Sequence, residues 1–154
     1  MTQRLRASHK IIVEAPVDQA FMFFTPAGEE LWVDGWKPTY VHPRDGRTEA
    51  GMVFTTGQGD ELTIWTMAEF DRKAHRSRYV RCTPASRTGI VQVRCAALDE
   101  TRAEAWVSYE LTALNAAGER ALEDFAGVRF AAMIDDWARK IASRRESLLA
   151  ADIR

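Results

Sequence analysis

Apolar side chains near the carboxyl end of the chain recur with the period of an α-helix. At 3.6 residues per turn, six large ones fall within an arc of about 100°. They are Phe130, Met133, Ile134, Trp137, Ile141 and Leu148. Acidic residues gather at the start of this segment and basic residues at its end, which is the order that the helix dipole favours. The pattern predicts one amphipathic helix over residues 119–150, with an apolar stripe that another element must cover.

The middle of the chain follows the two-residue period of β-strands. Six runs of this kind are separated by short turn-forming clusters: 36–42, 51–56, 61–70, 76–83, 89–97 and 102–113. A further run lies at residues 4–15. Runs joined by short turns favour an antiparallel meander over βαβ units. In the last run apolar residues alternate with mostly charged ones, which predicts a sheet with one buried face.

Two short helices are expected between the first strand and the others. Apolar residues between 17 and 24 have helical spacing directly after Pro16, and proline is favoured in the first turn of a helix. Thr25 and Pro26 then resemble a cap and the first position of a second helix, which ends at or before Gly35. The chain is therefore expected to be an α+β protein. Its curved antiparallel sheet of about seven strands would wrap around the long C-terminal helix.

Composition narrows the class of protein without indicating an activity. The 154 residues carry a net charge of −1, which gives no basis for binding nucleic acid or an anionic membrane. No apolar run approaches the ~20 residues needed to span a bilayer, and residues 1–10 lack the apolar core of a secretory signal. Cys82 and Cys95 are expected to be buried free thiols. We therefore expect a single cytoplasmic domain over residues 1–154, with no metal site and no cofactor.

Several short motifs, spread over essentially the whole chain, occur in the order found in one known superfamily. They are Ile11–Pro16, Leu31–Trp32, Trp36–Pro38, Ile64–Asp71, Tyr109–Leu114 and the last helix with Trp137. With these motifs the chain resembles the START/Bet v 1-like (SRPBCC) superfamily. Within it, the chain is similar to polyketide cyclase/dehydrase-type and Hsp90-activator-homologue-type bacterial proteins. The resemblance implies the helix-grip fold, in which the sheet wraps around the last helix.

Large aromatic residues and small residues are both expected where the sheet meets the last helix. A gap can remain where small side chains oppose large ones, and it would suit a lipid-like, aromatic or polyketide-like ligand. A core filled by the same rings is the alternative. The residues expected to bind such a ligand are Trp32, Trp36, Phe54, Trp65, Tyr79, Tyr109, Phe130, Met133, Ile134 and Trp137.

Few polar residues are placed for chemistry inside such a cavity. Glu69 shares the alternation of the inward-facing residues on its strand, so it is expected to enter the cavity beside Arg78 or Arg81. The candidates for catalysis are Glu69, Arg81 and Tyr109, and a solvated ion pair at the strand edge is the alternative for the first two. Among the histidines, only His9 is expected to face the interior.

Three functions remain open at this point. The first is the binding of a small hydrophobic ligand in the cavity. The second is a cyclase- or dehydratase-type enzyme acting on such a ligand, and the third is a chaperone-interacting module; the resemblance implies both. Trp106 shares the charged face of the last strand, so it is the candidate contact for a protein partner or a homodimer, unless a long neighbouring side chain covers it.

Overall fold

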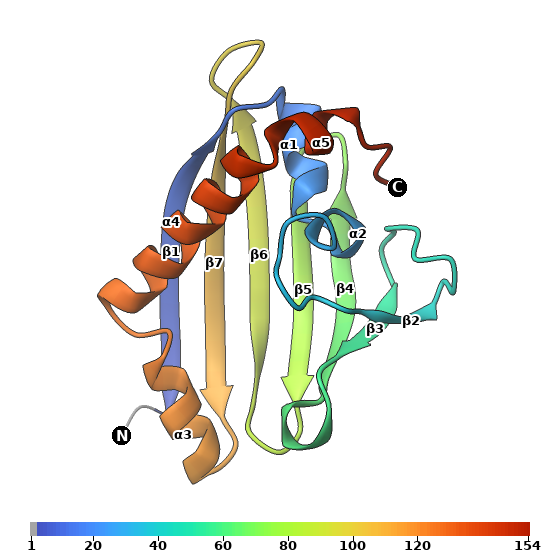
Figure 1. Ribbon diagram of the computed structural model, residues 1–154. Coiled ribbons are helices and arrows are strands. Elements are labelled where there is room, and N and C mark those ends of the chain that lie inside the picture. The colour runs from blue at the N-terminus through green and yellow to red at the C-terminus, as the bar shows by residue number, and fades with distance from the viewer. Residues whose placement is uncertain (1–2) are drawn as a thin grey trace.

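The computed structural model describes residues 3–154 and contains a curved antiparallel sheet of seven strands (Figure 1). The strands are β1 (Arg4–Val13), β2 (Thr39–His42), β3 (Val53–Thr56), β4 (Thr63–Asp71), β5 (Arg76–Thr83), β6 (Arg87–Ala97) and β7 (Ala103–Ala113). Their order in the sheet is β1-β7-β6-β5-β4-β3-β2. Consecutive strands from β2 to β7 are neighbours, as the predicted meander requires, and β1 completes the sheet beside β7. The predicted α+β class is confirmed.

The longer strands have a buried inner face and a more exposed outer face. On β7, Ala105, Val107 and Leu111 are fully buried, whereas Trp106 between them is 37% exposed. Successive side chains of a strand point to opposite faces, so the buried residues of these strands meet on the same side of the sheet. A few apolar residues, such as Ile64 and Val80, lie on the outer face. The division into an apolar and a charged face that was predicted for the last strand is confirmed on β7.

Two short helices, α1 (Val17–Phe23) and α2 (Pro26–Glu29), connect β1 to β2. The hydroxyl of Thr25 caps α2 by accepting a hydrogen bond from the backbone N–H of Gly28 at 3.1 Å. Trp32 Nε1 donates to the carbonyl of Phe23 at 2.8 Å, which fixes the chain after α2 against α1. A single 3-10 turn, η1 (Gly59–Glu61), precedes β4.

The C-terminal segment is not the single helix that the sequence predicted over residues 119–150. It is divided into α3 (Ala116–Glu123), α4 (Val128–Ser143) and α5 (Arg145–Ala150). Gly127 has a φ of 59°, which glycine adopts without the strain that a side chain would bring, and it separates α3 from α4. Arg144, with a φ of −118° and a ψ of 19°, leaves helical geometry between α4 and α5. Periodicity could not show the break at Arg144, because the apolar stripe continues across it from Ile141 to Leu148. All six stripe residues follow Gly127, so the stripe gave no information on the first break.

The longest helix, α4, packs against the inner face of the sheet over β1. Phe130, Ile134 and Ile141 are its buried residues, and His9 on β1 lies 2.7 Å from Asp135 of the helix. Figure 1 shows α4 crossing in front of β1, β7 and β6 toward α1, whereas α2 and the chain after it lie in front of β5 and β4. The inner face is thus covered by two separate elements, and a small cavity lies between them and the sheet.

Candidate functional site

A small cavity lies between the inner face of the sheet, α2 with the chain after it, and α4. Its volume is about 90 Å³, and most of its wall is apolar. Every strand from β3 to β7 contributes at least one side chain to it. The lining residues are Phe24, Glu29, Val33, Trp36, Phe54, Trp65, Tyr79, Val91, Val93, Tyr109 and Trp137.

Aromatic rings occupy most of the space around this cavity. Phe54 and Trp65 stack with their ring centroids 5.6 Å apart. Trp36 meets both rings edge-on, at 6.0 Å and 5.8 Å, and Tyr79 meets Trp65 edge-on at 5.9 Å. Stacked and edge-to-face contacts are the arrangements that the ring quadrupoles favour. The rings therefore hold one another in place and leave only a narrow gap.

Three of these rings use their polar atoms within the protein, and Trp65 Nε1 donates to the Thr56 hydroxyl at 3.0 Å. Trp36 Nε1 donates a hydrogen bond to the carbonyl of Pro26 at 3.0 Å, and the Tyr79 hydroxyl donates to the carbonyl of Phe24 at 3.0 Å. Burial is the main reason why the pKa of the Tyr79 phenol lies well above its usual value. These donors therefore fix the ring positions and leave little polarity in this part of the wall.

Tyr109 places a hydroxyl at the β7 side of the cavity. Its ring packs against Phe130 at 5.0 Å and Phe125 at 5.7 Å. Burial raises the pKa of this phenol; Arg81 opposes the shift and Glu29 adds to it. Within residues 3–154 the hydroxyl has no hydrogen-bond partner, so it is free to contact a ligand.

Glu29, the last residue of α2, brings a carboxyl group to the cavity. Burial raises the pKa of this carboxyl well above its ordinary value of 4.5. The residue is only partly buried, and its carboxyl oxygens are not among the buried polar atoms without a hydrogen-bond partner. The sequence analysis did not name this residue. The spacing in the sequence could have indicated it, because Glu29 precedes Val33 by four residues, about one helical turn. In the structure the Val33 N–H donates to the Glu29 carbonyl at 2.8 Å, and both side chains line the cavity.

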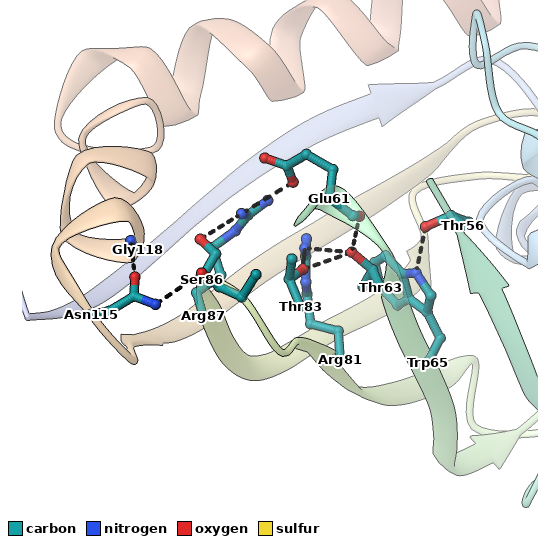
Figure 2. A network of polar contacts seen from close by, with 11 residues as sticks. Thr56, Glu61, Thr63, Trp65, Arg81, Thr83, Ser86, Arg87, Asn115 and Gly118 are labelled. Carbon is teal, nitrogen blue, oxygen red and sulfur yellow. Dashed lines mark hydrogen bonds and ion pairs between the residues drawn. The ribbon is translucent and has the colours of Figure 1, made fainter. Parts of the chain in front are cut away.

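A polar network lies on the same inner face beyond the cavity (Figure 2). Arg81 Nη2 donates to the Thr83 hydroxyl at 3.0 Å, and the Thr83 and Thr63 hydroxyls are 2.6 Å apart. The Arg81 guanidinium lies 4.9 Å from the centroid of the Trp65 ring. Burial, with a further contribution from Arg87, lowers the pKa of Arg81 to about 10. Arg81 thus faces inward, as the sequence predicted, but it stands behind Trp65 and does not line the cavity.

Glu69 lies outside the cavity, which corrects the sequence prediction. The register shifts between Met67 and Glu69, and this β-bulge exchanges the two faces of β4. Glu69 is therefore paired with Arg78 on the outer face, and its carboxylate lies 3.3 Å from Arg76 Nε. Phe70 packs against the core instead. Strict alternation along β4 could not anticipate the bulge.

The structure brings only part of the predicted ligand-binding set to the cavity. The residues that line it are Trp36, Phe54, Trp65, Tyr79, Tyr109 and Trp137. The others are packed in the surrounding core: Trp32, Phe130, Met133 and Ile134. Trp32, for example, supports the wall from behind, with its ring 5.7 Å from that of Trp137. Ligand binding by any of these residues stays a prediction.

The remaining candidates are placed away from this site. His9 faces α4, as expected, but its contact with Asp135 serves the docking of the helix, and it does not line the cavity. Residues 3–154 include no group of three or more His, Cys, Asp or Glu side chains arranged to hold a metal ion. In the same part of the chain, every helix is too short or too polar to cross a membrane.

Trp106 lies on the outer face, where long basic side chains cover part of its ring. Lys10 Nζ and the Arg94 guanidinium carbon lie 5.2 Å and 5.5 Å from the ring centroid. The ring nevertheless keeps 37% of its surface exposed. The covering side chains account for a tryptophan on a charged face without a protein partner, and the homodimer stays a prediction.

No protein-family model matches the chain, and no curated protein matches it in sequence. Solved structures do match. Ginseng major latex-like protein 151 from Panax ginseng has a TM-score of 0.65 at 8% identity, over 93% of this chain and 98% of that protein. Norcoclaurine synthase from Thalictrum flavum, in complex with dopamine and hydroxybenzaldehyde, has a TM-score of 0.60 at 12% identity, over 91% and 87% of the two chains.

A third match is Zhui aromatase/cyclase from Streptomyces sp. R1128, with a TM-score of 0.54 at 16% identity over 73% of this chain and 70% of that protein. The chain has the START/Bet v 1-like fold. The superfamily resemblance seen in the sequence is thereby confirmed at the level of the fold. Because the START/Bet v 1-like fold does not determine an activity, the function has to be argued from the cavity itself.

Proposed function

We propose that the cavity binds a small aromatic molecule. The observation that carries this proposal is a partly open cavity of about 90 Å³ with a mostly aromatic wall. An apolar cavity of about 150 Å³ is known to hold one benzene ring. Pockets for drug-sized ligands have roughly 300–1,000 Å³. One ring fits after a modest displacement of side chains, whereas a fatty-acid chain does not.

The exposure of the lining residues supports an entrance between α4 and the chain after α2. Val33, Trp36 and Trp137 are half-buried, whereas the aromatic residues Phe54 and Tyr79 on the strands are buried. The half-buried side chains come from the two elements that cover the sheet, and none of these three lies on a strand. Movement of these side chains would admit a ring without disturbing the sheet.

A protein of the same fold supports the single-ring class. Dopamine and hydroxybenzaldehyde, the compounds in the Thalictrum flavum norcoclaurine synthase structure, each contain one aromatic ring. At 12% identity the likeness extends to the fold alone. It therefore supports the size and aromatic character of the ligand that we propose. It does not support dopamine or hydroxybenzaldehyde in particular as that ligand.

Binding, and not turnover, is proposed because the predicted catalytic residues do not meet. Glu69 is on the outer face, and Arg81 stands behind Trp65. Of the three candidates, Tyr109 alone lines the cavity. These three residues therefore do not bring an acid, a base and a cation together, as a reaction that uses all three would require.

The proposal is tested by protein-observed NMR titration with toluene and 4-methylphenol as single-ring probes and dodecanoate as a chain probe. We expect saturable shifts of cavity-lining residues with both rings and none with dodecanoate. Val93→Phe should abolish the shifts, because Val93 lines the cavity and a larger side chain fills it. Overpacking of this kind costs about 1–3 kcal/mol, so the fold should survive.

The matched control is Val80→Phe, the same substitution on the outer face of the neighbouring strand, where Val80 is 42% exposed. It should leave binding unchanged. The proposal fails if neither ring binds the wild-type protein, or if Val93→Phe binds them as the wild type does.

A further inference from the structure

Two buried arginine side chains on the inner face of the sheet, near η1, leave part of their hydrogen-bonding capacity unused. Arg81 and Arg87 are 7% and 8% exposed. In each of them the Nε atom is buried and has no hydrogen-bond partner among the residues that the structure describes. A buried donor without a partner is rare and costly, and more so when the group is charged. The two arginines therefore call for an acceptor that these residues do not supply.

The sheet brings the two guanidinium groups close to one another. Arg87 of β6 pairs with Thr83 of β5 in the register, and Arg81 precedes Thr83 by two residues. Residues in this diagonal relation on neighbouring strands are roughly 7–8 Å apart, within reach of long side chains. Figure 2 shows both guanidinium groups extending from their strands toward Glu61. One small anion can therefore contact both of them.

Aromatic rings fix the orientation of each guanidinium group. The Arg81 guanidinium lies 4.9 Å from the centroid of the Trp65 ring, and that of Arg87 lies 6.0 Å from the centroid of the Phe125 ring. A guanidinium on a ring keeps its N–H groups free for hydrogen bonds in its own plane. The unpartnered Nε–H is one of these donors. Two parallel N–H groups of one guanidinium match the two oxygens of a carboxylate.

The neighbouring threonine hydroxyls supply no negative charge to this place. The Thr63 hydroxyl donates to the carbonyl of Glu61 at 3.0 Å. Because a hydroxyl has a single proton, the contact of 2.6 Å between Thr63 and Thr83 has Thr83 as its donor. Thr83 in turn accepts from Arg81 Nη2 at 3.0 Å. This chain of hydrogen bonds starts at a cation and ends at a neutral backbone carbonyl.

Glu61 is the only residue labelled in Figure 2 that carries a carboxylate. Its Oε2 lies 3.4 Å from Arg87 Nη1, longer than the roughly 2.7–2.9 Å of a strong charge-assisted hydrogen bond. The Glu61 side chain is 68% exposed, so solvent weakens the ion pair. The contact shows where a carboxylate approaches the arginines, but it compensates little of their buried charge.

We infer that Arg81 and Arg87 together bind the carboxylate group of a small molecule, which takes the place of the Glu61 carboxylate. Trp65 stands between Arg81 and the aromatic cavity, so this is a second site that goes beyond the proposed function. A free carboxylate is not tied to η1, so it can align with the Nε–H groups that Glu61 leaves without a partner.

The electrostatics of the pair favour such a ligand. Burial, with repulsion from Arg87, lowers the pKa of Arg81 to about 10. The pKa is still well above neutral pH, so both side chains carry a positive charge in a place with little water. An anion that contacts both reduces their repulsion and replaces lost hydration.

The experiment titrates the wild-type protein with acetate and with acetamide, which has nearly the same shape and no charge. Sodium acetate replaces sodium chloride at constant ionic strength, so that general screening does not change. The Nε–H resonances of Arg81 and Arg87 are followed by NMR. We expect saturable shifts of both resonances with acetate and none with acetamide.

Two variants of one arginine test the contact from the protein side. Arg87→Met removes the guanidinium and keeps an unbranched side chain, and the affinity for acetate should fall more than about tenfold, the effect of losing a charge-assisted hydrogen bond. Arg87→Lys keeps the charge but not the planar fork, so its loss should be smaller. The Arg81 resonance reports binding in both variants.

Glu61→Gln tests whether the ligand displaces Glu61. Removal of the competing carboxylate should raise the affinity for acetate about two- to fivefold, because an exposed ion pair is weak. Asp60→Asn is the matched control, with the same loss of charge at the exposed neighbouring residue of η1, and it should leave the affinity unchanged. Both substitutions are on exposed side chains, so this comparison decides the question if Arg87→Met does not fold.

The inference fails if acetate gives no saturable shift, or if acetamide gives the same one, because water would then suffice as the partner of the two Nε–H groups. An unchanged affinity in Arg87→Met would overturn it as well. Equal affinities in Glu61→Gln and Asp60→Asn would mean that the ligand does not take the place of Glu61. None of these results bears on ring binding, because toluene is uncharged and the aromatic cavity lies on the other side of Trp65.

Discussion

The inner face of β4 and β5 has an aromatic end and a polar end. The aromatic end lies toward α2 and carries Met67 and Tyr79. The polar end lies toward η1, where Trp65 and Arg81 come two positions further along the strands and threonines follow. Both ends are buried. At the polar end, hydroxyl and guanidinium groups bond to one another, as between Arg81 and Thr83 at 3.0 Å. At the aromatic end, Trp36 and Tyr79 donate to backbone carbonyls, at 3.0 Å each, and most of the wall is apolar.

The difference separates a polar network from the candidate site for an aromatic ring. In the network, hydroxyl and guanidinium groups bond to one another, although Arg81 Nε and Arg87 Nε are buried without a hydrogen-bond partner among the described residues. At the cavity, aromatic rings leave a mostly apolar gap of about 90 Å³, and the atoms that line it lose the contacts that a filled core would give them. The gap lies at the aromatic end, so the ring binding that we propose belongs there and not at the polar end.

The largest expected effect tests, through pH, whether burial raises the pKa of Glu29. Its pKa in the folded protein lies above the ordinary 4.5, so the stability that it contributes is fully present below about pH 4.5 and is lost as the pH rises through the raised pKa. We expect the unfolding free energy of the wild type, relative to Glu29→Gln, to fall above pH 4.5. The loss should be about 1.4 kcal/mol for each unit of pKa difference.

Urea unfolding at a series of pH values measures this difference. Glu30→Gln, at the exposed neighbouring position, should keep the pH dependence of the wild type. If the unfolding free energies of the wild type and Glu29→Gln changed with pH in the same way, the Glu29 carboxyl would be solvated in the folded protein. The difference in burial on which this prediction rests would then be wrong.

A smaller effect is expected when the polar end is broken by Thr83→Val. The substitution preserves shape but removes the hydroxyl that contacts both Thr63, at 2.6 Å, and Arg81, at 3.0 Å. Partners left unsatisfied in a buried site cost about 1–3 kcal/mol of unfolding free energy. Chemical denaturation measures the loss, and Thr66→Val, at a half-buried position on the outer face of the neighbouring strand β4, should change stability by less. Equal losses would show that the network contributes nothing specific.

Most of the fold was predictable because it follows from periodicity. The two-residue period located every strand, and the turn-forming clusters gave the meander. The C-terminal breaks were not predicted, because Arg144 interrupts the backbone between the stripe residues Ile141 and Leu148, and Gly127 lies before the first stripe residue, Phe130. Periodicity reports which side of a helix is buried, and it says nothing of the local dihedral angles that end one.

The site was predictable only in part, because its geometry depends on contacts between distant elements. Aromatic side chains such as Phe54 and Trp65 could be assigned to the interior by alternation alone. Which of the interior rings border a gap depends on how α4 and α2 share the inner face, as the placement of Trp32 behind the wall shows. Glu29 was not predicted as a cavity residue, because a charged residue at the end of a short helix is normally solvated.

The smallest effect is expected outside both regions, with Glu69→Gln. Glu69 is on the outer face because of the bulge in β4, and its partially exposed carboxylate lies 3.3 Å from Arg76. Surface ion pairs of this kind contribute about 0–1 kcal/mol, so unfolding free energy should change little. Titration with 4-methylphenol should be unaffected, because the side chain is separated from the cavity by the sheet. A loss of ring binding in Glu69→Gln would place this carboxylate inside, and the register of β4 that assigns the two faces would then be wrong.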